Sequence, residues 1–495
     1  MSTTFKPPAT QRVYDVCVVG AGLGGAAAGA LLSRRGFRVL LVDDGGASPP
    51  LADGGWLLPA GPAIRPAVRL LPAAEAMLTD LGLSSDIARS LEPLDPPLQV
   101  LLPRHRLELH SDAAGLARGL RREWPARAGA LAEGLARLAA ATELGGALLK
   151  EAPPLPPAGL FDRWTLGRAI RRAAALTGQG AAAITGGSPL SGLEDSPLAA
   201  ALTALAGFLG RLDGPPSPFV LARLAGVALG GLQRPAAGAP GLEDGLRRRI
   251  GETRGEVLGS QAEPVRIESI GLERGRLSTV RVAASMDTRL ARAFVIATPL
   301  ARLAGLLPPE GRTSRVARSL AAVQPGSRLV ACHLLLRATA RPPGLGEAAL
   351  VLDAAGGAGG AVLIELSPAR RETRRGAPPE FAPDHFSASA WALLPPGTGE
   401  APTRVRLRAA LDAALPFHER HLVHRAEPAP VAHGLRFEAA GPLGTGGLPV
   451  RSPWRNAFLA SGEVLPGLGL EGELFAGLLV AAHVEAFLGT KGRPR

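Results

Sequence analysis

Three glycines near the start of the chain have the spacing of a nucleotide-binding turn. Gly20, Gly22 and Gly25 follow the β-branched run VYDVCVV (13–19) and precede the small-residue run AAAGALLSRRG (26–36). In such a turn the first glycine allows the bend, the second lets the backbone approach a pyrophosphate, and the third lets the helix pack closely on the strand. The helix start then offers free N–H groups and partial positive charge to the pyrophosphate. The spacing therefore predicts a strand, turn and helix that bind a dinucleotide.

An acidic pair at the end of the next strand indicates which dinucleotide is bound. FRVLLV (37–42) is typical of a second buried strand, and Asp43 and Asp44 follow it at the distance expected from the glycine turn. A carboxylate at this position accepts hydrogen bonds from the ribose hydroxyls and repels a 2′-phosphate. FAD or NAD fits this position, and NADP does not. The predicted contacts of this segment are Gly20, Ala21, Gly22, Leu23, Gly24, Gly25, Asp43 and Asp44.

A second glycine-rich turn lies near the other end of the chain. FLASG (458–462) is typical of a buried strand, and the apolar run ELFAGLLVAAHVEAFLG (473–489) of a helix. With the N-terminal unit, RNAFLASGEVLPGLGLEGELFAG (455–477) resembles the FAD-dependent phytoene desaturase (phytoene dehydrogenase) family, within the flavin amine oxidase superfamily. The resemblance implies FAD as cofactor, with this segment at its flavin half. The implied contacts are Gly462, Glu463, Gly469, Leu470, Glu471 and Gly472.

The resemblance assigns a role to each part of that C-terminal segment. It places Gly462 and Glu463 at the pyrophosphate and ribityl chain, and the backbone from Gly469 to Gly472 against the flavin pyrimidine ring. Backbone N–H groups at a helix start stabilise the negative charge that develops on a flavin during reduction.

The resemblance continues in the middle of the chain and fails at one motif. Residues 241–282 are similar to the family's helix, strand and turn before the adenine, and Val265 matches the adenine-contacting position. The family's Arg-x-Gly-Gly motif is degenerate, because no arginine accompanies Gly45 and Gly46. Gly61-Pro62 resembles the Gly-Pro turn that follows it in the family. The contacts at the flavin ring therefore stay open.

These motifs predict an α/β fold with two domains. Apolar residues recur every three or four positions through most of 65–240, which indicates helices, and every second position in 254–299, which indicates strands. The predicted Rossmann-like FAD-binding domain is discontinuous, and an α+β substrate-binding domain is formed by the rest. The FAD-binding segments are 12–75, 240–300 and 440–490, and the substrate-binding segments are 76–239 and 301–439.

The charge and cysteine content exclude several functions. The net charge is +12, but it is almost all arginine interspersed with acidic residues, since Lys6, Lys150 and Lys491 are the only lysines. Ala, Gly, Pro and Arg all have GC-rich codons, so codon bias explains this composition and we expect no nucleic-acid partner. Cys17 and Cys332 form neither a disulfide framework nor a CxxC pair. We expect a cytoplasmic protein, with contact to a membrane surface left open.

Three histidines near residue 420 provide no metal site in this interpretation. His418, His421 and His424 have a spacing that would place them on one arc of a helix, but the segment around them is partly strand-like. We expect three surface histidines and no bound metal.

The composition and one apolar segment direct the choice of function. A flavin amine oxidase commonly uses an aromatic cage and a lysine near the flavin, whereas this chain has one tyrosine, Tyr14, and three lysines. The apolar run 196–232 suits helices that line a lipophilic tunnel, touch a membrane surface, or form ordinary core. We therefore expect an FAD-dependent desaturase or dehydrogenase of a small lipophilic substrate, such as a carotenoid or isoprenoid, which transfers hydride to the flavin.

Other functions and several details stay open. The electron acceptor is oxygen, a quinone or another molecule, and no catalytic residue is assigned. The alternatives are a flavin amine oxidase or protoporphyrinogen-oxidase-like enzyme, and a non-enzymatic prenyl-binding protein of the GDP dissociation inhibitor type. The intact glycine turn and Asp43 argue against the last of these.

Overall fold

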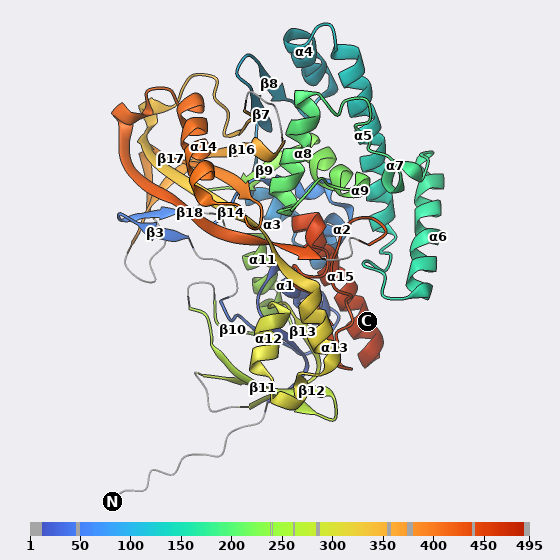
Figure 1. The fold of residues 1–495 in the computed structure, drawn as a ribbon. Coiled ribbons are helices and arrows are strands. Elements are labelled where there is room, and N and C mark those ends of the chain that lie inside the picture. Colours follow the sequence, from blue (N-terminus) through green and yellow to red (C-terminus); the bar gives the residue numbers. More distant parts are fainter. Residues whose placement is uncertain are drawn as a thin grey trace, which may run out of the picture.

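Two large sheets and a set of helices make up the protein (Figure 1). The computed structural model describes residues 12–45, 50–237, 239, 241–260, 263–283, 288–353, 358–373, 380–437 and 441–489. The first sheet lies in the lower part of Figure 1, the second at the upper left, and most helices at the upper right.

The first sheet is Rossmann-like. Its strand β1 pairs in parallel with both β2 and β13, β10 extends it beyond β2, and β19 pairs in parallel with β13. These strands are β1 (Arg12–Val19), β2 (Val39–Val42), β10 (Gly255–Leu258), β13 (Thr288–Ile296) and β19 (Ala457–Leu459). An antiparallel hairpin of β11 (Ile267–Glu273) and β12 (Arg276–Val282) continues the sheet from β13. The strands predicted at 13–19 and 37–42 are thus confirmed, within two end residues, and the strand predicted at 458–462 is shorter and ends at Leu459.

The two ends of the chain meet beside this sheet. Helix α1 (Leu23–Arg34) packs against α15 (Gly469–Leu488) and α11 (Leu242–Glu252). A Cβ added at Gly24 would lie 2.3 Å from the carbonyl oxygen of Ala460, so only glycine permits this approach. The N-terminal turn and the C-terminal motif are therefore parts of one region.

The second sheet has nine strands and carries helix α14 (Glu400–Ala414) on one face. Its main path is β18–β14–β17–β16–β15–β7–β8, and β3 and β4 are attached at β16. Its strands are β3 (Leu51–Asp53), β4 (Trp56–Leu58), β7 (Leu98–Leu101), β8 (Arg106–Leu109), β14 (Val323–Arg337), β15 (Ala348–Val351), β16 (Val362–Arg371), β17 (Glu380–Leu394) and β18 (Leu422–Phe437). The opposite face contributes to the main hydrophobic core through side chains such as Leu363 and Trp391.

Helices fill most of the span from 65 to 240, as expected. They are α2 (Pro72–Leu81), α3 (Ser84–Arg89), α4 (Ala113–Glu123), α5 (Ala128–Lys150), α6 (Leu160–Thr177), α7 (Ala182–Thr185), α8 (Pro197–Gly210), α9 (Pro218–Leu221), the π-helical turn η2 (Ala222–Gly226) and α10 (Val227–Leu229). Short strands that the periodicity does not predict also occur there. Three of them, β5 (Arg65–Pro66), β6 (Leu91–Pro93) and β9 (Leu232–Pro235), form a third sheet. The other two are β7 and β8 of the second sheet. Helices α12 (Leu300–Leu306) and α13 (Ser314–Ala322) follow the first sheet.

One helical segment has the length of a membrane span. Within the described residues, Pro466–Leu488 alone meets the length and hydropathy of such a span, and 67% of its most apolar stretch is buried inside the protein. This segment contains α15, which packs against α1, so we interpret it as a helix of the protein core.

Candidate functional site

The glycine turn presents a helix N-terminus with no competing side chain. Gly20 has φ +89°, and a Cβ there would lie 2.8 Å from the backbone nitrogen of Thr298. Helix α1 begins at Leu23, and within the described residues no side chain caps it and no acidic residue lies in its first turn. The first N–H groups of a helix have no partner within the helix. The turn therefore fits the pyrophosphate that the sequence predicts.

Asp43 is buried at the carboxyl end of β2 with one oxygen unsatisfied. Its side chain is 2% exposed, and its Oδ1 accepts a hydrogen bond from the Gly45 N–H at 3.1 Å. Its Oδ2 accepts no hydrogen bond from any described residue, although a nitrogen of Arg247 lies 3.2 Å away. A buried acceptor without a donor is unfavourable. A ribose hydroxyl would supply that donor.

Arg247, on α11, lies across the position that a ribose would take. Besides its ion pair with Asp43, its Nη2 donates a hydrogen bond to the carbonyl oxygen of Ala21 at 3.3 Å. Its Nε is buried and has no hydrogen-bond partner among the described residues. A ribose at Asp43 must therefore share or displace this guanidinium group. The sequence analysis missed Arg247, because nothing in its local pattern marks it.

The other predicted residues of this half occupy the same area. Asp44 is buried and its Oδ2 lies 3.2 Å from Arg302. Val265, the predicted adenine contact, donates its N–H to the carbonyl oxygen of Asp43 at 2.8 Å, so its own N–H is already used. Gly46, in the degenerate motif, lies outside the described residues.

At the C-terminal motif, Glu463 is engaged by the protein itself. Gly462 and Glu463 follow β19, and the Glu463 side chain is 4% exposed. Its Oε2 accepts hydrogen bonds from the N–H of Leu300 at 2.9 Å and from the hydroxyl of Ser461 at 3.2 Å. Burial raises the pKa of Glu463, and these donors oppose the rise. Its carboxylate thus holds the start of α12.

The first turn of α15 is also occupied. Glu471 accepts two hydrogen bonds from Arg223 of η2, at 2.9 and 2.6 Å, and both side chains are almost fully buried. Gly469 has φ +51°, and a Cβ there would lie 2.4 Å from the carbonyl oxygen of Leu209. The end of α8 therefore lies directly against the turn that the resemblance assigns to the flavin. Leu470 and Gly472 complete that turn, with Gly472 buried.

The space at this half is small. A cavity of about 90 Å³ borders Pro62, Ile64 and Glu471, and one of about 160 Å³ borders Gly462 and Glu473. Both are bounded by Leu209, Arg211 and Leu470. Ligand pockets usually measure roughly 300–1,000 Å³. The groups at the glycine turn thus suit the ribose and pyrophosphate of FAD, whereas each of the two cavities at the Leu209–Arg211 turn is smaller than a usual ligand pocket.

Glu365, on β16, positions the Gly61-Pro62 turn. Its carboxylate accepts hydrogen bonds from the N–H groups of Ala63 and Ile64, the shortest at 2.7 Å, and from the Trp391 indole at 3.0 Å. Burial raises the pKa of Glu365 to about 7. The sequence had offered no reason to select it, since its partners lie far away in the chain.

Ser389 connects Glu365 to a second buried polar group on the same sheet. Ser389 pairs with Glu365 on one side and His333 on the other, and its hydroxyl lies 2.8 Å from Nδ1 of His333. Burial lowers the pKa of His333 to about 4. This row shows how strand register brings together polar residues that are distant in sequence.

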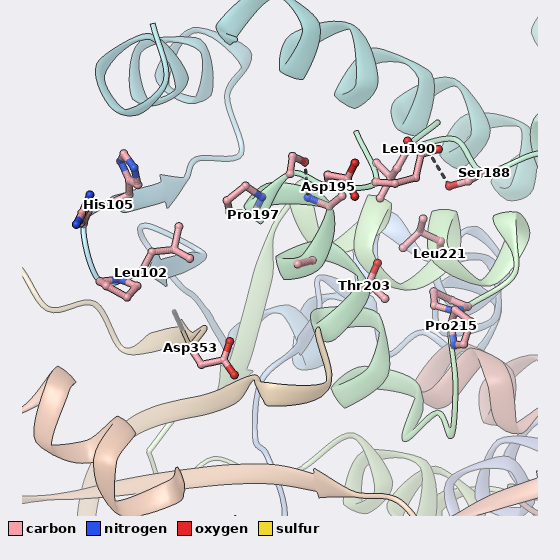
Figure 2. A pocket seen from close by; sticks show the side chains of 17 residues that line it. Leu102, His105, Ser188, Leu190, Asp195, Pro197, Thr203, Pro215, Leu221 and Asp353 are labelled. Atoms are coloured by element: carbon pink, nitrogen blue, oxygen red, sulfur yellow. Dashed lines mark hydrogen bonds between the residues drawn. The ribbon is translucent and has the colours of Figure 1, made fainter. Parts of the chain in front are cut away.

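A larger cavity, of about 1070 Å³, lies on the other side of α8 (Figure 2). Pro197, Ala199, Ala200 and Thr203 of α8 line it. Leu102, Leu190, Leu221 and Pro215 add apolar surface, and Arg104, Glu194, Asp195 and Asp353 are the charged lining residues. The apolar run 196–232 is mostly buried, and part of it lines this cavity.

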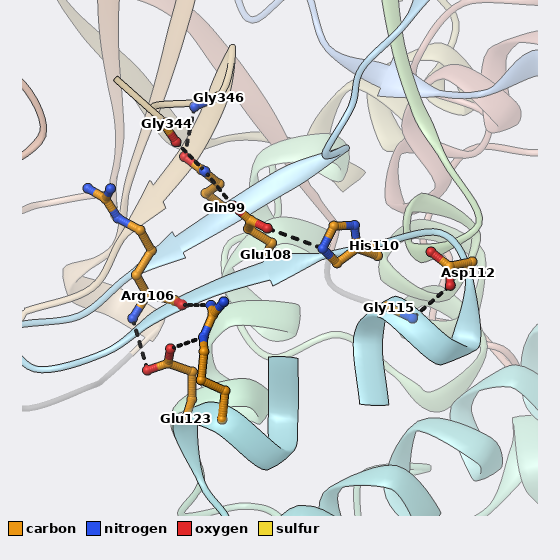
Figure 3. Close-up of polar contacts among 10 residues, drawn as sticks. Gln99, Arg106, Glu108, His110, Asp112, Gly115, Glu123, Gly344 and Gly346 are labelled. Carbon is orange, nitrogen blue, oxygen red and sulfur yellow. Dashed lines mark hydrogen bonds and ion pairs between the residues drawn. The ribbon is translucent and has the colours of Figure 1, made fainter. Parts of the chain in front are cut away.

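One wall of this cavity is a hairpin turn fixed by polar contacts (Figure 3). The turn joins β7 to β8 and contributes Leu102 to His105. Gln99 binds the backbone of Gly344 and Gly346, both at 2.8 Å. Such contacts hold the hairpin in place beside the sheet.

The three histidines near residue 420 do not gather. His418 is buried and its Nδ1 lies 2.9 Å from the carbonyl oxygen of Leu415, so the expectation of three surface histidines is wrong for this one. His424 instead lies 3.1 Å from Asp53. Among the described residues, no group of three His, Cys, Asp or Glu side chains is arranged to hold a metal ion.

Comparisons with known proteins agree with this architecture. Residues 18–81 match the family model of an NAD(P)-binding Rossmann-like domain. The chain has a mixed α/β fold with a Rossmann-like NAD(P)-binding domain. Comparison with curated protein sequences gives no match.

Several solved structures share the whole fold at low sequence identity. Putrescine oxidase bound to putrescine has a TM-score of 0.56 at 14% identity, covering 96% of this chain and 100% of its own. An oxidoreductase from Methanosarcina mazei has 0.52 at 14%, covering 94% and 100%. A Rab GDI from Plasmodium falciparum has 0.52 at 9%, covering 98% and 100%. At these identities the likeness shows the fold, which oxidases and a Rab GDI share.

Proposed function

We propose that the protein is an FAD-dependent oxidoreductase that acts on a lipophilic substrate. This proposal rests on the buried Asp43 carboxylate, whose Oδ2 accepts no hydrogen bond from the described residues besides its ion pair with Arg247, and on the uncapped N-terminus of α1. These groups match the ribose and pyrophosphate of one dinucleotide. FAD, once bound, would supply a hydride acceptor.

The large cavity supplies space for a substrate, with apolar surface on the side of α8 and charged residues elsewhere in its lining. Its floor is formed by apolar residues of α8, and the last turn of that helix reaches the C-terminal motif. A carotenoid or isoprenoid placed along α8 would extend toward the flavin half of the site. Desaturation or dehydrogenation by hydride transfer is the reaction that suits such a substrate, with oxygen, a quinone or another molecule as electron acceptor.

The proposal requires the Leu209–Arg211 turn to move when FAD binds. Arg211 has φ +51°, in the left-handed region, where a non-glycine residue is strained. Gly210 precedes it, and Gly214 lies shortly after it. Displacement of this turn would join the cavities of about 90 and 160 Å³ that it separates.

Reconstitution with FAD tests the proposal. We expect purified protein to retain FAD through desalting and to show flavin absorbance in the visible range. Anaerobic addition of a carotenoid precursor should then bleach the flavin. Protein that never retains FAD would overturn the proposal, and bleaching by amines alone would replace it with an amine oxidase.

A second candidate is a non-enzymatic protein that binds lipophilic molecules. The closed flavin half favours it, because Arg223 and Glu471 satisfy each other without a cofactor. If this candidate is correct, lipophilic ligands bind in the large cavity and the purified protein does not bind FAD.

A further inference from the structure

Helix α6 carries an exposed apolar surface at the edge of the molecule. In Figure 1 it is the outermost helix on the right, and it packs against α5. Its buried side chains are Leu166, Ala169 and Ala173. Its exposed large apolar side chains are Leu160 (84% exposed), Phe161 (74%), Trp164 (56%) and Leu176 (74%).

The exposed residues of α6 have an ordered arrangement. Leu160, Trp164, Arg168 and Arg171 follow one another at intervals of four, four and three residues, which places them along one helix face. The ring centroids of Phe161 and Trp164 are 5.9 Å apart, and the Arg168 guanidinium lies 5.8 Å from the Trp164 ring. An aromatic and aliphatic end is thus followed by a basic band on the same face.

The charge of this surface is positive. Arg163, Arg168, Arg171 and Arg172 are all exposed. Arg172 is paired with Glu151 at 2.9 Å. The single acidic residue of the helix, Asp162, accepts a hydrogen bond from the Ala158 N–H at 3.0 Å, which binds it to the helix start.

We propose that α6 docks the protein onto an anionic membrane surface. Helices that lie in the membrane interface combine a face rich in Trp, Phe and Leu with a polar face rich in Lys and Arg. In α6 these residue types follow one another along the helix, with the apolar ones at its N-terminal end. The aromatic side chains would enter the headgroup region, and the arginines would contact lipid phosphates. The exposed arginines of α6 complement the charge of an anionic membrane, and they would not complement an apolar protein surface.

Val405 on α14 does not form such a surface. It is 69% exposed, but its neighbours Arg404 and Arg406 are polar and no other exposed large apolar residue lies on that helix. Single exposed apolar residues are normal on protein surfaces. The apolar run 196–232, considered for membrane contact from the sequence, is mostly buried, so the membrane surface is assigned to α6 instead.

The chain that follows α6 leads to one wall of the large cavity. The chain leaves α6 through α7, and the next segment contributes Ser188, Leu190 and Asp195 to the cavity wall. Docking itself does not depend on the proposed function, since it involves neither FAD nor the cavity.

Vesicle co-sedimentation tests the proposal. We expect the protein to bind vesicles of phosphatidylcholine and phosphatidylserine, to bind pure phosphatidylcholine at least tenfold more weakly, and to lose binding as salt rises. The double variant Phe161→Ser/Trp164→Ser should lower the partition coefficient at least tenfold, and Arg168→Gln/Arg171→Gln about tenfold. Val405→Ser is the matched control and should bind like the parent protein.

Three outcomes would overturn the proposal. These are absence of binding to the anionic vesicles, equal binding by Phe161→Ser/Trp164→Ser, and an equal loss in Val405→Ser. Analytical sedimentation without lipid tests self-association of the protein through α6. If the protein is a dimer that Phe161→Ser/Trp164→Ser abolishes, while vesicle binding by this variant is unchanged, the surface serves self-association. Vesicle binding without FAD retention would leave docking intact and reject the proposed function alone.

Discussion

The two halves of the dinucleotide site differ in what satisfies their polar groups. At the glycine turn, Oδ2 of Asp43 is ion-paired with Arg247 but accepts no hydrogen bond from the described residues, and the start of α1 is uncapped within them. At the C-terminal motif, Glu471 is paired with Arg223, and Glu463 is held by Leu300. The first half therefore still offers a carboxylate oxygen and helix N–H groups to a ligand, whereas these two carboxylates of the second half are already hydrogen-bonded by the protein.

This difference shows what a binding motif contains. The glycine turn specifies its own geometry, because strand, turn and helix are contiguous in the sequence. The C-terminal motif specifies a backbone path as well, but the space around it depends on residues from α8 and η2. The sequence of such a motif therefore predicts the backbone path at a binding site, but it does not predict how much space the neighbouring helices leave for the ligand.

The largest effect is expected from breaking the ion pair of the flavin half. Glu471→Ala removes the carboxylate that neutralises the buried Arg223 and leaves it, among the described residues, only the carbonyl oxygens of Thr142 and Leu70, so we expect the free energy of unfolding to fall by about 3–5 kcal/mol. Urea denaturation measures this. The double variant Arg223→Met/Glu471→Leu removes both charges and should stay near the parent. A loss below about 1 kcal/mol for Glu471→Ala would contradict the claim that this half is satisfied by its own pair.

A pH-dependent effect follows from Glu365, which holds the turn next to that half. Its pKa is about 7 when folded, against an ordinary 4.5, so the folded protein binds more protons between these values. Stability contributed by this group is therefore present below pH 4.5 and is lost as pH rises through about 7, by up to about 3 kcal/mol. Urea denaturation across this range should show a flatter profile for Glu365→Gln.

Glu473 provides the control for this prediction. Burial also raises its pKa to about 7, so Glu473→Gln should remove a separate part of the same slope. A Glu365→Gln profile as steep as that of the parent would refute the assignment to Glu365.

The ADP half is tested by filling its turn. A Cβ at Gly22 would lie 3.1 Å from the carbonyl oxygen of Ala297, a tight contact, and would have no other neighbour within 4 Å among the described residues, so we expect Gly22→Val to fold after a small backbone shift, which circular dichroism checks. Its branched side chain would block the approach of the pyrophosphate, and we expect ADP affinity to fall at least tenfold, or about 1.4 kcal/mol. Calorimetric titration measures this, with Gly129→Val on the surface of α5 as control. Unchanged affinity in Gly22→Val would place the nucleotide elsewhere.

A smaller effect is expected from the ribose contact. Asp43→Asn should weaken ADP severalfold, because the amide accepts fewer hydrogen bonds from the ribose hydroxyls. It should also reduce the preference for ADP over 2′,5′-ADP, since the charge that repels a 2′-phosphate is gone. The ratio of the two dissociation constants is the measurement, and a ratio equal to that of the parent would exclude contact with the 2′ position.

Much of the fold follows from local patterns in the sequence. Apolar residues that recur at every second position, or at every third or fourth, predict β1, β2, β11 to β13 and α15. Each of these elements buries one face or both along a contiguous stretch of sequence. The short strands β5, β6 and β9 are missed, since two to four residues carry no period. The glycine turn and Asp43 are also local, and the structure brings them together as their spacing implies.

The occupied half of the site is not predictable in this way. Arg223, Arg247 and Glu365 act on residues 200 to 300 positions away, and no spacing rule relates them. Their partners are set by how the helices and the second sheet pack. His418 illustrates the same limit, because it is buried although Phe417 before it is exposed and Glu419 after it is charged, so the fold around it decides its burial.

Competition between ADP and FAD tests the account most directly. Protein equilibrated with FAD is titrated with ADP, and free flavin is followed by its fluorescence. We expect ADP to displace FAD. We also expect Leu209→Gly, which removes a side chain from the turn over the flavin half, to raise FAD affinity while leaving ADP affinity unchanged. FAD that ADP cannot displace, or equal changes in both affinities in Leu209→Gly, would contradict it.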